Sequence, residues 1–162
     1  ENTGKPVVLF PFAFHMYRAP ASWSQPRVMQ NLAQIRKGDG LRISETSFMN
    51  AALSERLDNY PMRFYLSGFQ TGIDLYRLMA NISDGKHPLF HEGSEIDLFG
   101  YSIGAFLAQI MLIANKDDTL SGSKCFLFAG GSVFEDMNGK SKLIMDSNAF
   151  SRLLNYFIND LE

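Results

Sequence analysis

The sequence is poor in features that would fix a compartment or a macromolecular partner. It has one cysteine, Cys125, so it cannot form an internal disulfide. A single cysteine does not tell an oxidising compartment from a reducing one. Its 15 Lys and Arg stand against 17 Asp and Glu, without the positive excess typical of nucleic-acid-binding domains. The longest apolar run, residues 103–114, is shorter than the roughly 18 residues of a membrane-spanning helix. We therefore expect a soluble protein with neither nucleic-acid partner nor transmembrane segment.

Signatures of metal and cofactor binding are also missing. The sequence contains no Cys and His cluster at metal-ligand spacing and no Gly-x-Gly-x-x-Gly, so we expect no metal and no cofactor. The first residue is Glu1 and not Met, which leaves open a signal peptide that has been removed. A cytoplasmic location is the simpler expectation, and nothing in the sequence indicates an oligomeric state.

What is present is a globular composition, 46% hydrophobic and 20% charged, with alternating patterns. Short apolar runs predict buried strands at 6–10, 95–100 and 124–129. Apolar residues at helical spacing predict helices at 26–36, 44–57, 61–82, 103–114 and 147–161. Within helix 61–82, Gly68 and Gly72 indicate close approach of a neighbouring element. The alternation of strand and helix predicts an α/β fold, a mainly parallel sheet with helices on both faces.

The motif Gly100-x-Ser102-x-Gly104 joins a predicted strand to a predicted helix. Such a tight turn crowds the backbone, so small residues are needed on either side while the serine is pushed outward. At the start of a helix, free amides and the helix dipole can stabilise an oxyanion, and the amide of Ile103 would be one donor. The motif predicts Ser102 as a nucleophile. The alternative is a turn whose serine only caps the helix.

In this motif and in the order of its elements, the chain resembles the α/β-hydrolase superfamily of serine esterases, lipases, thioesterases and peptidases. The resemblance implies a three-layer sandwich in a single domain over 1–162, incomplete at both ends. It makes 147–162 a candidate for the start of a cap or crossing helix. It also implies a serine hydrolase acting on an ester or related acyl bond of a small-molecule substrate.

The resemblance further implies a second oxyanion donor in the loop that follows strand 6–10. Many members of the superfamily carry His-Gly there, whereas this chain has Pro11-Phe12. Ala13 is the first candidate for the donor and Phe12 the second. The candidates for substrate binding are Phe14, His15 and Tyr101. The aromatic residues of the loop either wall an acyl pocket or simply cover the sheet edge.

The base and the acid of a catalytic triad are not evident. The superfamily order is serine, acid, histidine, yet no histidine follows Ser102. His15 is expected to have a structural or substrate-contacting role, with an unusual base as the alternative, and His87 and His91 are expected on the surface. The acid candidates are Glu135, Asp136 and Asp146. Two hypotheses remain: the chain is part of a larger hydrolase and lacks its last strands, or it is a non-catalytic binding or scaffolding protein.

Overall fold

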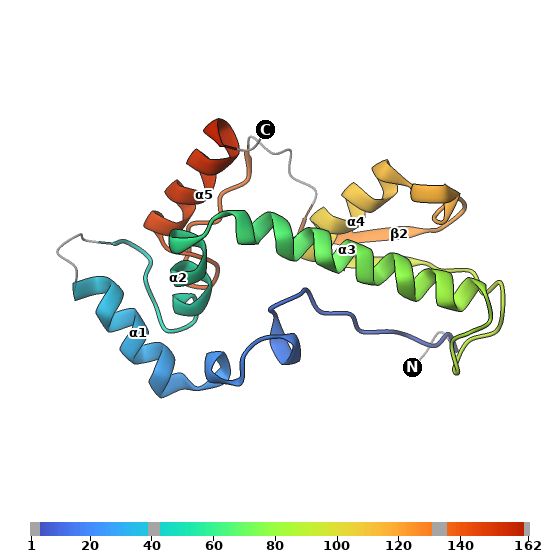
Figure 1. Cartoon of the computed structure of the whole chain (residues 1–162), viewed down its shortest axis with the longest axis horizontal. Helices are drawn as coiled ribbons and strands as arrows, with labels where there is room; N and C mark the ends of the chain where they lie inside the picture. The colour runs from blue at the N-terminus through green and yellow to red at the C-terminus, as the bar shows by residue number, and fades with distance from the viewer. Residues whose placement is uncertain (1–3, 39–42, 131–135, 161–162) are drawn as a thin grey trace.

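The computed structural model describes residues 4–38, 43–130 and 136–160, and these residues are mainly helical. The elements are α1 (Pro26–Gly38), α2 (Ala51–Asn59), α3 (Met62–Ser83), β1 (Leu98–Tyr101), α4 (Ile103–Ala114), β2 (Cys125–Phe128) and α5 (Ser147–Asn159), with 3-10 turns at Met16–Arg18, Ala21–Ser24 and Lys116–Asp118. Figure 1 shows α3 running across the molecule, with α1, α2 and α5 gathered at one end and α4 and the strands at the other. Over these residues no helix is both long and apolar enough to cross a membrane.

The predicted three-layer α/β sandwich is wrong. In the described ranges the sheet has two parallel strands, β1 and β2, in a register that runs from Leu98 opposite Cys125 to Tyr101 opposite Phe128. The segment 6–10 forms no strand, and Val7 and Leu9 are 74% and 84% exposed. A run of β-branched residues becomes a strand only where a neighbouring strand supplies hydrogen-bond partners, and no strand among the described residues pairs with this run.

The prediction of helices on both faces of the sheet is also wrong. Helix α4 packs on one face, against both strands. None of the described residues covers the other face, which is aromatic: Phe99 stacks on Phe126 with ring centroids 5.5 Å apart, and Tyr101 on Phe128 at 5.8 Å. Cross-strand stacking of this kind stabilises the pairing of β1 with β2.

The helices agree better with the sequence pattern. Helix α4 has the predicted bounds, and α3 begins one residue after Pro61. Helix α2 begins at Ala51 and not near Ser44, because Ser47 and Asn50 bind the preceding loop instead. The Ser47 amide donates to Asn50 Oδ1 at 3.0 Å, and Asn50 Nδ2 donates to the carbonyls of Glu45 and Ser141, each at 2.8 Å. Side chains of this type compete with helix formation by bonding the local backbone.

The apolar core is divided between the two ends of the molecule. At the sheet end, Met79 of α3 packs with Leu107 and Met111 of α4. At the helical end, Leu57 of α2 packs with residues of α5, and Phe64 of α3 lies against this cluster. Helix α3 therefore contributes to both cores and joins the two ends.

A buried network of charges holds the helical end together. Arg36 of α1 donates to both carboxylate oxygens of Asp146, from Nε at 2.9 Å and from Nη2 at 3.1 Å, and to Glu55 Oε2 at 2.7 Å. Asp146 also caps α5, accepting from the amide of Ala149 at 3.1 Å, and its own amide donates to Ser54 Oγ at 3.0 Å. Burial disfavours the charged guanidinium, yet the bonds to Asp146 and Glu55 raise the pKa of Arg36.

We predict that Asp146→Ala destabilises the fold by about 3 kcal/mol, because it removes the helix cap and leaves a buried arginine short of its main partner. Urea denaturation of both proteins measures the difference. The matched control is Asp84→Ala, which breaks the exposed ion pair with Lys86 and should cost no more than about 0.5 kcal/mol. Equal effects of the two substitutions would contradict a structural role for the network.

The predicted close approach at Gly68 and Gly72 is wrong, since a Cβ at either position would meet no atom within 4 Å. We therefore predict that Gly72→Ala stabilises the protein by about 0.5–1 kcal/mol, through the better helix propensity of alanine alone. The reverse substitution on the same helix, Ala80→Gly, should destabilise it by a similar amount. Thermal or urea unfolding checks both, and a loss of stability in Gly72→Ala would show an unrecognised contact.

Candidate functional site

Ser102 lies at the junction of β1 and α4 with a strained backbone. Its φ of 52° and ψ of −119° fall in a region that residues other than glycine seldom adopt. The amide of Ser102 donates to the Phe128 carbonyl of β2 at 2.9 Å, and its carbonyl accepts from the amides of Ala105 at 2.9 Å and Phe106 at 3.3 Å. Hydrogen bonds to both β2 and the first turn of α4 thus hold the strained conformation in place.

The close packing of this turn depends on glycines beside it. A Cβ on Gly100 would lie 2.6 Å from Ala105 Cα, and one on Gly130 would lie 2.4 Å from Ala105 Cβ. Gly104 differs, since a Cβ there would meet nothing within 4 Å. The predicted steric need for the first motif glycine is confirmed, and that for the second is wrong. Gly130, after β2, is a third position of the turn that the motif does not include.

The side chain of Ser102 is exposed and makes no capping hydrogen bond to α4. The interpretation of Ser102 as a simple capping residue therefore does not hold. The first amides of a helix have no intrahelical acceptor, and no acceptor among the described residues binds those of Ile103 and Gly104, which lie beside the hydroxyl. The positive end of the helix dipole favours negative charge at the same place.

The loop expected to supply the second oxyanion donor is held against α3. The amide of Ala13 donates to Thr71 Oγ1 at 3.0 Å, and that hydroxyl donates to the carbonyl of Ser67 at 2.6 Å. Phe12 packs against the core between α3 and α4. Ala13 would have to release Thr71 to bind an oxyanion, and the donor roles of Ala13 and Phe12 stay predictions. The sequence does not reveal this role of Thr71, because the loop residue that it binds, Ala13, is 58 positions away in the chain.

The candidates for substrate binding lie on two different surfaces. The Phe14 ring lies under the guanidinium of Arg56, 4.2 Å from its centroid, and the His15 amide closes a turn on the Phe12 carbonyl at 3.0 Å. Tyr101, 62% exposed, belongs to the aromatic face of the sheet. Among the described residues no hydrogen bond or ring contact joins Phe14 or His15 to the turn at Ser102.

No base or acid is hydrogen-bonded to Ser102 within the described ranges. His87 and His91 lie in the loop before β1, which enters the strand at the end opposite to Ser102. Asp146 is bound to Arg36 and buried, so this carboxylate is not available as a triad acid. Asp136 is exposed, and Glu135 lies outside the described residues. The same ranges hold no group of three His, Cys, Asp or Glu residues that could bind a metal ion.

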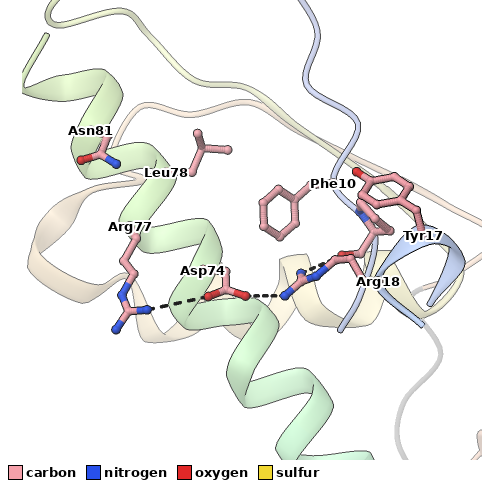
Figure 2. Close-up of a pocket in the computed structure, with 8 residues that line it drawn as sticks. Phe10, Tyr17, Arg18, Asp74, Arg77, Leu78 and Asn81 are labelled. Atoms are coloured by element: carbon pink, nitrogen blue, oxygen red, sulfur yellow. Dashed lines mark hydrogen bonds and ion pairs between the residues drawn. The ribbon is translucent and has the colours of Figure 1, made fainter. Parts of the chain in front are cut away.

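A cavity of about 480 Å³ lies between the N-terminal loop and α3, and Figure 2 shows the residues that line it. Asp74 lies between two arginines there, 2.5 Å from Arg18 Nη2 and 3.9 Å from Arg77 Nη1. Arg18 also donates to the carbonyl of Pro11 at 3.0 Å and lies over the ring of Phe10. Asp74 gives both arginines of this cavity a carboxylate within ion-pair distance, which weakens their attraction for a charged ligand.

Comparison with protein families matches residues 1–162 to DUF6051, described as a family of unknown function. No curated protein and no solved structure matches the chain.

The strain at Ser102 can be measured. We predict that Ser102→Gly is more stable than Ser102→Ala by about 1 kcal/mol, because glycine adopts this backbone conformation without the penalty of a Cβ. Ser151, exposed on α5, is the control, where the glycine variant should be less stable than the alanine variant. The urea midpoints of the four variants measure these differences in stability. If the glycine variant were less stable than the alanine variant at both positions, Ser102 would be unstrained.

Proposed function

We propose that this chain, which belongs to the DUF6051 family of unknown function, is a serine hydrolase that acts on an ester or related acyl bond through Ser102. The observation that carries the proposal is the backbone of Ser102, with φ 52° and ψ −119° at a turn from strand to helix. Strain of this kind costs about 1–3 kcal/mol and persists only where the surroundings enforce it, as at active sites. In this conformation the Ser102 side chain is exposed and its hydroxyl does not cap the helix.

The chemistry would proceed through an acyl-serine. Ser102 Oγ attacks the carbonyl carbon of the ester while its proton passes to a general base, and the oxyanion forms beside the amide of Ile103. The bond from carbon to the alcohol oxygen then breaks, and the alcohol leaves with a proton. Water hydrolyses the acyl-serine and regenerates the hydroxyl. Loss of one oxyanion donor from such a site lowers turnover by about 10²–10³.

A specific observation favours an alternative, a non-catalytic binding or scaffolding protein. A serine hydroxyl is a weak nucleophile without a neighbouring base, and no histidine is hydrogen-bonded to Ser102 in the part of the chain described. The Ala13 amide is also engaged, with Thr71. Under this alternative the strained turn would serve packing alone.

Labelling with a fluorophosphonate probe distinguishes the serine hydrolase from the non-catalytic binding protein. In an active serine hydrolase the nucleophile attacks the phosphorus, fluoride leaves, and the serine keeps a covalent phosphonate. We predict labelling of the full chain on the peptide that contains Ser102, and its loss in Ser102→Ala. The control, Ser121→Ala, removes another exposed serine and should keep the label. Peptide mapping by mass spectrometry identifies the labelled residue.

Absence of labelling at Ser102 would overturn the enzyme proposal and support the binding protein. Labelling that survives Ser102→Ala would place the reactive serine elsewhere and would also overturn the role of this turn.

A further inference from the structure

A second, smaller cavity of about 180 Å³ lies where the end of α2 meets the start of α3. Trp23 and Leu32 form its apolar wall. Arg56, Tyr60 and Arg63 form the polar wall. The first turn of α3 contains no acidic residue, so the partial positive charge at this helix end is not offset locally.

Arg56 is a buried cation without a carboxylate partner. Its residue is 8% exposed, and its Nη2 donates to Ser67 Oγ at 2.9 Å and to the carbonyl of Arg63 at 3.3 Å. The guanidinium also lies over the ring of Phe14. Across the described residues it forms no ion pair. Buried charges are normally paired, because desolvation of a lone ion costs several kcal/mol. That cost is comparable to the whole free energy of unfolding of a small domain.

A second guanidinium lines the same cavity, that of Arg63, which is exposed and not buried. Arg63 lies over the ring of Tyr60, 4.3 Å from its centroid, and has no carboxylate within ion-pair distance in the described ranges. The carboxylate on the wall, Glu55, accepts from Arg36 Nη1 at 2.7 Å and from Asn59 Nδ2 at 2.7 Å. Burial, and then the charge of Arg63, lower the pKa of Arg56. The cavity thus holds an excess of positive charge.

We propose that this cavity binds a small oxyanion group, a phosphate or a carboxylate, between Arg56 and Arg63, with any attached apolar part against Trp23. Planar guanidinium groups bind such oxyanions through paired, charge-assisted hydrogen bonds. The cavity in Figure 2 differs, because a carboxylate, Asp74, already lies within ion-pair distance of its two arginines. The anion site is separate from Ser102 and goes beyond the proposed hydrolase.

The chain offers a built-in reporter for the test. Trp23, its one tryptophan, lines this cavity, so the intrinsic fluorescence reports on the site. Inorganic phosphate and acetate are titrated separately into the full chain, with chloride keeping the ionic strength constant so that general screening is the same throughout. We predict a saturable change in fluorescence with at least one of the two anions, and the better anion identifies the oxyanion class.

Arg63→Gln is the decisive variant, because Arg63 is exposed and its loss should leave the fold intact. We predict at least about tenfold weaker anion binding, the equivalent of about 1.4 kcal/mol, for the loss of one charge-assisted contact. The matched control is Arg77→Gln, an exposed arginine of the same helix outside the cavity, which should bind as the wild type does. Circular dichroism checks that both variants are folded.

No saturable change with either anion would overturn the site, as would equal binding by Arg63→Gln and Arg77→Gln. Ser102→Ala should bind the anion like the wild type, so failure of the anion site and failure of the hydrolase proposal are distinguishable.

Discussion

The buried ion pair between Arg36 and Asp146 is the interaction on which the arrangement of the helices depends. The two residues are 110 positions apart, and Asp146 also caps α5 and binds Ser54 of α2. Through its carboxylate and its backbone amide, this one residue therefore contacts three helices. Because Leu57 of α2 and the residues of α5 form the core against which Phe64 packs, the same pair also fixes the start of α3.

From its start, α3 transmits this placement to the other end of the molecule. Thr71, at the middle of the helix, holds the loop at Ala13, and Met79 packs against α4. The first turn of α4 packs so closely against β1 and the end of β2 that Gly100 and Gly130 have no space for a side chain. The hydrogen bonds of Ser102 to Phe128 and to the first turn of α4 hold its strained backbone within this close packing.

A structural feature could be predicted from the sequence where the residues that cause it are close together in the chain. The turn at Ser102 was predictable, because the motif, the strand before it and the apolar helix after it are contiguous in sequence. The fold class was not, because the apolar segment 6–10 becomes a strand only if a distant strand pairs with it. The exposed stacking of Phe99 on Phe126 is likewise invisible to a pattern that equates aromatic residues with burial.

The two buried arginines illustrate the same limit and show why it matters for function. Arg36 and Arg56 both lie in amphipathic helices and are both at least nine-tenths buried. Their sequence neighbours do not identify their partners, because Glu55 stands beside Arg56 yet pairs with Arg36. Three carboxylates surround Arg36, and the pKa of its guanidinium is raised, whereas Arg56 faces Arg63 and its pKa is lowered. Burial of a compensated charge stabilises one conformation, while burial of an uncompensated one leaves a free-energy cost that a bound anion would offset. The same cost of burying a charge that makes the ion pairs of Arg36 structural therefore makes Arg56 a candidate anion-binding residue.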